Sequence, residues 1–314
     1  MIYTILYNVH IITFFLLKEG LLMTHIRQNF GVDFKKIREN KSYTQQYVAQ
    51  DAMARSTYTK FEMGNIVPTI TKYFQILNNL DMTHEEFNYI HNDYQLKGKD
   101  AILYQFRTMA VNTDISILIN VRETTKNYLT EHKDNIVQDI FYICNALITL
   151  SKTNDLTQAA SYAEKVWHRI SQLDKWYLTE LRLLNNILFF FDFDTSLFIS
   201  KRALIELEHY SHFHEATALK MAYSMNLIYL LMENKNYEQA LEKADSLILL
   251  SKEKERYRIL GVLYVRKGII LTKLAKNTEA EVWIQKGFNL LEAIEDFPLK
   301  KELDKEVLYY LNHS

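Results

Sequence analysis

The feature that most constrains this chain is a helical pattern that recurs about every 40 residues beyond residue 100. The same point of the pattern holds Ala159 in DLTQAASYAEKV, Leu197 in FDTSLFISKRAL, Ala240 in NYEQALEKADSL and Ala280 in NTEAEVWIQKGF. The successive separations are 38, 43 and 40 residues. Because a period of about 34 to 47 residues is typical of stacked helix pairs, residues 101–314 are predicted to form an α-solenoid, capped by a last helix at Leu299–Leu311. An irregular helical bundle is the alternative.

Composition favours an all-α chain. Two prolines and seven glycines among 314 residues are far fewer than average usage, which is about 5% and 7%. The length indicates two structural units. The single cysteine, Cys144, cannot form an intrachain disulfide, which fits a reducing cytosol. Its apolar neighbours FYICNALITL predict a buried, unreactive thiol.

Residues 44–64, TQQYVAQDAMARSTYTKFEMG, predict two short helices joined by a tight turn. The Thr44 hydroxyl can cap the first helix by accepting a backbone N–H. Small apolar residues then follow at helical spacing, which lets a second helix approach closely, and Gly64 supplies the stop. The inward-facing residues are expected to be Val48, Ala49, Ala52, Tyr58 and Phe61.

The opposite face of the second helix carries Arg55, Ser56, Thr59 and Lys60, whose side chains can donate hydrogen bonds. A helix that reads base edges in the major groove of DNA needs such a face. Residues 23–90 hold eight Lys or Arg against seven Asp or Glu, a net charge of +1. Affinity for DNA must therefore come from this local face. A dimer would present two such faces, and salt should weaken the binding.

Further helices are expected around this pair. One begins near Asn29 with Phe30, Phe34 and Ile37, another spans Ile70–Leu80, and a capping box at Thr83 begins a fifth that contains Phe87 and Ile90. The predicted organisation is a helix-turn-helix domain at 23–90, a polar linker at 91–100 and the repeat domain at 101–314.

Residues 1–22 are apolar, but Asn8 and His10 interrupt the run, and it lacks a basic start and a small-residue cleavage site. Its apolar core is also shorter than the ~20 residues of a membrane span. Lys18-Glu19-Gly20 can be encoded by a sequence similar to a bacterial ribosome-binding site. We therefore expect translation to start at Met23, with residues 1–22 as a non-native extension.

With these two parts in order, the chain resembles the Rgg/MutR family of transcriptional regulators over roughly residues 24–314. The family signature stands here as Tyr43-Thr44-Gln45, Val48-Ala49, the run RSTYTKFE at 55–62, and Gly64. The segment NYEQALEKA is also similar to the tetratricopeptide pattern. One departure is Ala54, where related domains usually carry a Ser or Thr cap; its loss costs about 1 kcal/mol.

The resemblance implies a Cro/CI-type DNA-binding domain followed by a tetratricopeptide-like domain that binds short signalling peptides. By position it gives Gln45 a phosphate contact, Arg55 and Ser56 base-reading positions, and Lys60 a place further along the groove. Arg38 and Glu62 fall where relatives place a structural ion pair. A solvated charged face is the alternative for Arg55 and Lys60.

Positions 14 residues before three of the alanines are polar: Asn145, Asn226 and Arg266. In the remaining repeat Asn186 lies close to this place, with Arg182 one turn before it. Equivalent positions of successive first helices line one groove of a solenoid. Asn can pair with the backbone of an extended peptide and Arg with a carboxylate, while Tyr229 could supply an apolar wall together with Tyr223, Phe189 and Phe190. Ordinary helix-surface polarity is the alternative for each residue.

Nothing in the sequence indicates an enzyme. No paired acid and base, and no Gly-rich phosphate loop, stands out. The cluster HYSHFH (His209, His212, His214) lacks a second pair of zinc ligands nearby and is expected to be an interhelical loop. Neither a metal nor a cofactor is predicted.

The sequence therefore predicts a cytoplasmic regulator that binds operator DNA as a homodimer and is switched by a short peptide in the repeat groove, without membrane contact. RNA polymerase is a further candidate partner. One alternative is a repeat-type interaction or scaffold protein without a DNA target. Another is a repressor that binds DNA without a peptide.

Overall fold

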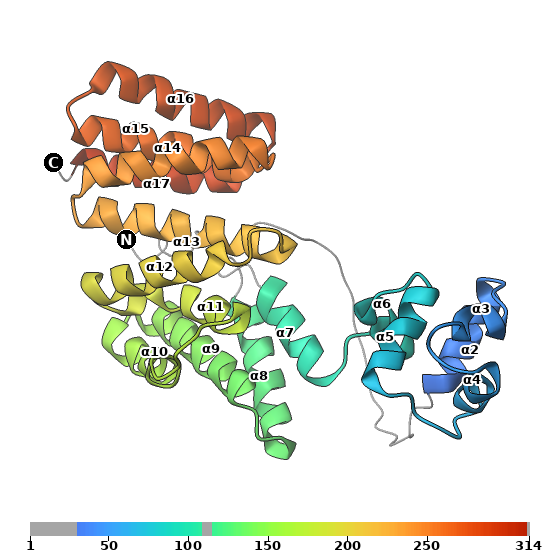
Figure 1. The fold of residues 1–314 in the computed structure, drawn as a ribbon. Coiled ribbons are helices and arrows are strands. Elements are labelled where there is room, and N and C mark those ends of the chain that lie inside the picture. The colour runs from blue at the N-terminus through green and yellow to red at the C-terminus, as the bar shows by residue number, and fades with distance from the viewer. Residues whose placement is uncertain (1–29, 109–114, 313–314) are drawn as a thin grey trace. The chain divides into compact units, whose positions relative to one another are not determined.

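The computed structural model describes residues 30–108 and 115–312, and every regular element in these two ranges is a helix (Figure 1). The extension expected at residues 1–22, the start at Met23 and the helix start near Asn29 lie outside them. Contacts divide the described chain into two units, the first ending at Tyr104 and the second beginning at Gln105. None of the described helices is both long and apolar enough to cross a bilayer.

The first unit contains five short helices and the start of a sixth: α2 (Phe30–Asn40), α3 (Gln45–Ala49), α4 (Arg55–Glu62), α5 (Ile70–Asn79), α6 (His84–His91) and α7 (Gly98–Thr108). Its core holds the inward-facing residues expected from the sequence, with Val48, Ala49 and Tyr58 fully buried. Phe34 lies at its centre and contacts the rings of Phe61 and Phe87 at centroid distances of 5.2 and 4.3 Å. The helix-turn-helix predicted at 44–64 is confirmed as α3 and α4.

Side-chain caps mark the start of two helices of the first unit. Thr44 accepts a hydrogen bond from the Tyr47 N–H, and Thr83 accepts one from the Glu86 N–H. Ala54 occupies the N-cap of α4 without a side-chain hydrogen bond. The polar stretch 91–100 is helical at both ends, so only residues 92–97 separate α6 from α7. His91 is the last residue of α6, and its ring stacks on Phe30 at 4.4 Å between centroids and on Phe87 at 5.7 Å.

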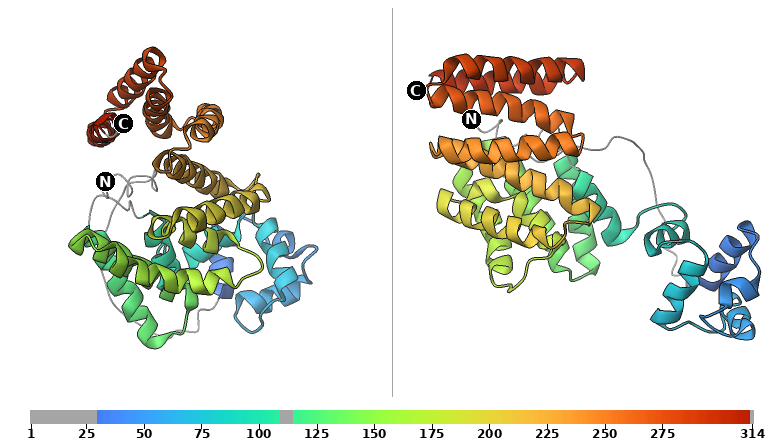
Figure 2. Two further views of the ribbon diagram at one scale, coloured as in Figure 1. Left: turned by 90° about the vertical axis from the view of Figure 1, so that its left-hand side faces the viewer. Right: turned by 45° about the horizontal axis from the view of Figure 1, so that its top comes forward.

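The second unit is the predicted α-solenoid, in which antiparallel helices follow one another in a curved stack (Figures 1 and 2). Its helices after α7 are α8 (Ile115–Glu131), α9 (Asn135–Thr153), α10 (Leu156–Ser171), α11 (Leu178–Asn185), η1 (Leu188–Phe190), α12 (Phe193–Glu208), α13 (His214–Glu233), α14 (Tyr237–Glu253), α15 (Tyr257–Lys273), α16 (Asn277–Ala293) and α17 (Phe297–Asn312). The three repeat alanines lie on α10, α14 and α16 and are buried, while Leu197 of α12 is partly buried against the core.

Two backbone features occur where successive helices of this unit are joined and packed. After α13, α14, α15 and α16 the chain leaves each helix through a left-handed residue, namely Lys235, Glu255, Ala275 and Glu295. The next N–H then returns to the helix, as in Asn236 N to Leu231 O at 2.8 Å, which satisfies a free carbonyl. Between α15 and α16, a Cβ on Gly287 would lie 2.7 Å from the Gly261 carbonyl oxygen, so these helices approach closely only because glycine stands there.

Candidate DNA-binding face and repeat groove

The outer face of α4 carries the residues predicted to contact DNA. Arg55, Ser56 and Lys60 are exposed and Thr59 is half-buried, whereas Tyr58 and Phe61 on the inner side are buried. The sequence places these side chains on two faces because residues three and four apart in a helix point the same way. The helix therefore exposes hydrogen-bond donors to solvent on one face, while the apolar residues of its other face pack in the core.

A buried ion pair ties this helix to α2. Arg38 Nε donates to Glu62 Oε1 at 2.6 Å and Nη2 donates to Oε2 at 3.1 Å. The two residues are only 8% and 3% exposed, and Arg38 also donates to the Tyr43 carbonyl oxygen at 3.0 Å. The hydrogen bond to the Glu62 carboxylate raises the pKa of Arg38. The orientation of α4 is thus fixed by two parallel hydrogen bonds as well as by packing.

Gln45 and Thr59 belong to the same network. Gln45 Nε2 donates to Glu62 Oε2 at 2.8 Å, and Gln45 Oε1 accepts from the Thr59 hydroxyl at 3.0 Å. The Thr59 hydroxyl also lies 3.0 Å from the Arg55 carbonyl oxygen. The sequence placed these two side chains toward DNA, whereas the structure shows that they first join α3 to α4. The second hydrogen of Gln45 Nε2 has no described partner.

The asparagines that the sequence assigned to the repeat groove form hydrogen bonds with other residues of the repeat unit. Asn145 Nδ2 donates to the Phe141 carbonyl oxygen, and Asn186 Nδ2 donates to the Arg182 carbonyl oxygen, each at 2.8 Å. Asn226 Nδ2 donates to Asn185 Oδ1 at 3.0 Å. Asn145 is half-buried, while Asn186 and Asn226 are 5% and 3% exposed. Sequence reasoning missed Asn185, which joins α11 to α13, because nothing local marks residues 41 positions apart as partners.

The two selected arginines each contact a glutamate of the chain. Arg182 forms an ion pair with Glu215 of α13. Arg266 Nε donates to Glu306 Oε1 of α17 at 2.8 Å, and the guanidinium of Arg266 lies 5.4 Å from the Tyr229 ring centroid. Arg266, Glu306 and Tyr229 are all buried, whereas Arg182 is accessible in part. Neither glutamate carries a sequence signal for these roles.

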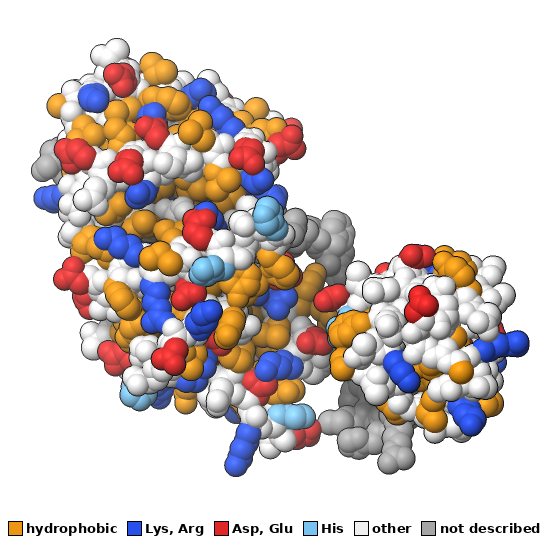
Figure 3. Space-filling view, in the orientation of Figure 1, with side chains coloured by type: hydrophobic (Ala, Val, Ile, Leu, Met, Phe, Trp, Pro, Cys, Tyr) orange, Lys and Arg blue, Asp and Glu red, His pale blue; other side chains and the backbone are white. Residues whose placement is uncertain are grey.

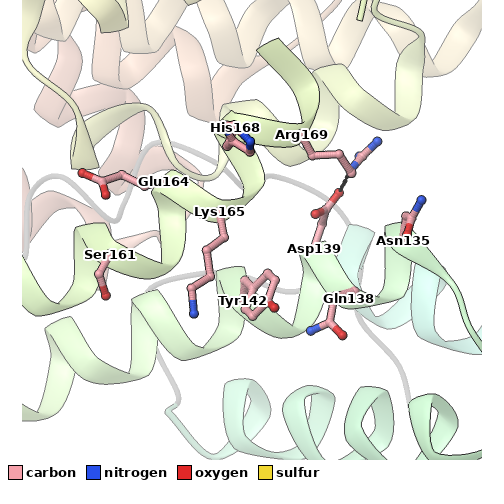
Figure 4. Close-up of a pocket in the computed structure, with 9 residues that line it drawn as sticks. All are labelled: Asn135, Gln138, Asp139, Tyr142, Ser161, Glu164, Lys165, His168 and Arg169. Carbon is pink, nitrogen blue, oxygen red and sulfur yellow. Dashed lines mark hydrogen bonds and ion pairs between the residues drawn. The ribbon is translucent and has the colours of Figure 1, made fainter. Parts of the chain in front are cut away.

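An open pocket of about 510 Å³ lies between α9 and α10 (Figure 4). It is lined by Asn135, Gln138, Asp139, Tyr142, Ser161, Glu164, Lys165, His168 and Arg169. The Asp139 carboxylate accepts from Arg169 Nε at 2.7 Å, yet burial raises the pKa of Asp139 to about 6 against the opposing pull of that guanidinium. Sequence reasoning did not select this pocket.

The remaining candidates have structural roles. Cys144 is buried, and burial raises the pKa of its thiol to about 12. His209 is the C-cap of α12 and His214 begins α13, so the HYSHFH cluster spans the loop between these helices. Within the described ranges, no group of three His, Cys, Asp or Glu residues could hold a metal ion. On the face of the repeat unit seen in Figure 3, acidic and basic side chains are interspersed.

Comparison with family models gives two matches. The model described as "HTH-type transcriptional regulator Rgg, C-terminal domain" matches residues 118–305, and a helix-turn-helix model matches residues 34–87. Together these matches include both candidate sites. Among curated proteins, no sequence relative matches.

Solved structures of the same fold cover nearly the whole chain. A protein from Listeria monocytogenes EGD-e described as a transcriptional regulator has a TM-score of 0.75 at 17% identity and covers 92% of this chain and 99% of its own. The pheromone receptor Rgg2 of Streptococcus dysgalactiae has a TM-score of 0.71 at 13% identity, with 89% and 99% covered. PlcR of Bacillus thuringiensis, solved with the peptide PapR7 and DNA, has a TM-score of 0.66 at 18% identity, with 88% and 99% covered.

Proposed function

Because the chain belongs to the Rgg family of helix-turn-helix transcriptional regulators, we propose that α4 binds operator DNA and that a short peptide in the repeat groove controls this binding. A transcriptional regulator needs no catalytic site. The side chains that we propose for each of the two ligands are supported by the burial and contacts described above.

The observation that supports DNA binding is that α4 is held firmly in the first unit while its outer face exposes hydrogen-bond donors. Arg38 and Glu62 lock α4 against α2, while Arg55, Ser56 and Lys60 extend from the opposite side. Arg can donate two hydrogen bonds to guanine, and Lys60 can neutralise a phosphate further along the groove. Gln45 Nε2 keeps one hydrogen for a phosphate oxygen, and Thr59 positions Gln45.

We propose that the chain acts as a homodimer. A single short recognition helix buries too little surface to select one site, and a two-fold dimer reads two half-sites about one helical turn, or a multiple of it, apart. The C-terminal helices are the proposed seam, because α16 and α17 expose large apolar side chains. Val282 is 63% exposed, Phe297 59% and Leu308 58%.

The repeat unit is the proposed peptide receptor. PlcR was solved with a peptide and DNA, and Rgg2 is described as a pheromone receptor. In this chain Asn145 and Arg182 are accessible enough for direct contact, and Asn186 Oδ1 is a buried acceptor without a described partner. Asn226, Tyr229 and Arg266 are buried, and we propose that they support the peptide-contacting residues from within the unit. A short, mostly apolar peptide fits this mixture of amide, guanidinium and aromatic groups.

The proposed setting is the bacterial cytoplasm, where operator DNA and RNA polymerase, a further proposed partner, are both present. The alternative of a scaffold protein without a DNA target has no use for the exposed donor face of α4. A footprint on promoter DNA separates the two.

The test is selection of binding sites from random duplex DNA by the full-length chain, followed by footprinting. The expected result is one enriched sequence with two half-sites related by two-fold symmetry. Calorimetry with synthetic peptides from a short reading frame beside the gene then tests the second ligand. If no DNA sequence is enriched, the proposal is contradicted. If the chain binds DNA but binds none of the peptides, the alternative of a repressor that works without a peptide is favoured.

A further inference from the structure

Two arginines in the repeat unit are already bound to carboxylates of the chain itself. Arg182 of α11 contacts Glu215 at the start of α13, and Arg266 of α15 contacts Glu306 of α17. In both cases the guanidinium occupies a first helix of a repeat, where a ligand's carboxylate would also meet it. The two pairs differ in burial and in their surroundings, and this difference separates a structural pair from an exchangeable one.

The two ion pairs differ first in how deeply their side chains are buried. The side chains of Arg266 and Glu306 are 1% and 2% exposed, so removing Glu306 would leave an uncompensated charge inside the protein. The side chains of Arg182 and Glu215 are 17% and 48% exposed. Water can therefore solvate the Glu215 carboxylate as soon as it leaves the guanidinium, and a partly exposed pair of this kind contributes little to stability.

The two ion pairs differ second in the charged groups that surround them. Arg107 Nη1 of α7 lies 3.8 Å from Glu215 Oε1, so two guanidinium groups share one carboxylate. Burial and the neighbouring Arg107 charge lower the pKa of Arg182, which is the sign of a site short of negative charge. The groups that act on Arg266 are Glu306, Tyr310 and Tyr229, and Tyr310 also donates to a further carboxylate, that of Glu233, at 2.5 Å. An incoming anion is favoured at Arg182 and disfavoured at Arg266.

A neighbouring group identifies the kind of anion. Asn186 lies one helical turn after Arg182, is 5% exposed, and its Oδ1 has no hydrogen-bond partner among the described residues. A buried amide oxygen without a donor costs free energy until a ligand N–H reaches it. The last residue of a peptide carries an N–H and a carboxylate within a few atoms of each other, which matches an acceptor whose side chain is bonded to the Arg182 backbone, one helical turn from the residue that supplies the guanidinium.

Building on the peptide-binding function proposed above, we propose that Arg182 and Arg107 bind the free C-terminal carboxylate of the peptide in place of Glu215. Glu215 occupies this subsite in the unliganded chain and competes with the ligand. Asn186 Oδ1 accepts the N–H of the terminal residue. The subsite therefore selects peptides that end in a free carboxylate and rejects those with a blocked C-terminus.

The test uses two pools of N-acetylated octapeptides with random positions drawn from Leu, Ile, Val, Phe and Gly, one as free acids and one as C-terminal amides. Retention of each pool by the full-length chain is measured by affinity selection and mass spectrometry. Wild type is compared with Arg182→Gln, Glu215→Gln and the control Glu208→Gln. Glu208 is an exposed carboxylate at the end of α12 that pairs with Lys220 of α13 at 2.6 Å, so this control removes an equivalent charge from the helix that precedes Glu215.

Wild type should retain the free acids about tenfold more strongly than the amides, because a charge-assisted pair is lost on amidation. Glu215→Gln should raise retention of free acids about threefold or more without changing that of the amides. Arg182→Gln should abolish the preference, and Glu208→Gln should resemble wild type. Equal retention of both pools by wild type, or a preference that survives Arg182→Gln, would overturn this inference alone. Retention of neither pool by any variant would overturn the peptide-binding function with it.

Discussion

Arg38 Nε and Nη2 donate to the two carboxylate oxygens of Glu62 at 2.6 and 3.1 Å, joining α2 to the helix that carries the DNA-binding face. The pair is enclosed, since the two side chains are 10% and 2% exposed. It also receives Gln45 from α3. One carboxylate thus connects three helices of the first unit, and its removal should loosen α4 without replacing Arg55, Ser56 or Lys60.

Glu62→Gln should lower the free energy of local unfolding of α2 and α4 by about 3 kcal/mol, because Arg38 keeps a buried charge without its counter-ion. Hydrogen exchange measured by mass spectrometry on peptides from 30–64 reports this local stability in the full chain. Glu39→Gln is the matched control. Glu39 lies 3.4 Å from Arg38 Nη2 but its side chain is 53% exposed, so its loss should cost about 0.5 kcal/mol or less. Equal effects of the two variants would refute the structural role of Glu62.

Ala54→Ser should stabilise α4 by about 1 kcal/mol, because a serine hydroxyl at this N-cap could accept a backbone N–H that alanine leaves to water. The backbone at Ala54 already has the φ of −59° and ψ of 144° that suit a capping residue. Thr44→Ala is the converse variant and should cost about the same amount in α3. Exchange rates in residues 55–62 measure the gain. Slower exchange is expected, and unchanged or faster exchange would show that the missing cap does not limit this helix.

Asp139 should make the stability of the repeat unit depend on pH. Burial raises its pKa to about 6, so the folded chain holds the proton more tightly than the unfolded chain does. The resulting stabilisation is fully present below about pH 4 and is lost as the pH rises through about 6. From pH 4 to pH 7.5 the wild type should lose about 2 to 3 kcal/mol relative to Asp139→Asn.

Urea unfolding followed by tryptophan fluorescence at several pH values checks this dependence. Trp167 and Trp176 lie in or just after α10, the helix that supplies Arg169 to Asp139. Asp174→Asn, which changes an exposed aspartate in the same region, serves as the control and should follow the wild-type curve. A constant difference between wild type and Asp139→Asn across this range would show that the buried carboxyl is not the group that titrates.

Gly287→Ala should weaken the contact between α15 and α16 by about 1 to 3 kcal/mol, as overpacking of a close interface does. The added Cβ would lie 2.7 Å from the Gly261 oxygen and 2.9 Å from the Val265 nitrogen, both backbone atoms that cannot rotate away. Asn289→Ala, an exposed change on the same helix, is the control. Hydrogen exchange in residues 257–293 should rise in the first variant only. Equal protection in both would mean that the helices can separate without cost.

Local signals allowed much of the fold to be predicted. Thr44 and Thr83 cap the helices they were expected to cap, and the repeat alanines 159, 240 and 280 are buried on second helices, because hydrogen bonding over three residues and helical spacing are properties of short segments. The left-handed exits at Lys235, Glu255, Ala275 and Glu295 carried no such signal, since none of them is glycine.

The sites were less accessible to sequence reasoning. The exposure of Arg55 and Lys60 follows from helical periodicity, but the environment of the repeat-groove residues depends on distant partners. Asn186 illustrates this, because α11 ends at Asn185 and leaves Asn186 as its C-cap rather than on the middle of a helix face. The contacts of Arg182 with Glu215 and of Arg266 with Glu306 join residues 33 and 40 positions apart, and only the stacking of repeats brings them together.

We propose that α4 reads operator DNA through Arg55, and a binding titration on the selected duplex measures this contact. Arg55→Ala should lower specific affinity at least about tenfold and relax selection at one base pair per half-site, as loss of a bidentate base contact does. Lys36→Ala, which removes a side chain of α2 that is 69% exposed, should change affinity by less than about twofold. Circular dichroism should show unchanged helix content in both variants. An Arg55→Ala chain that binds the selected duplex as tightly and selectively as wild type would show that Arg55 does not read the operator.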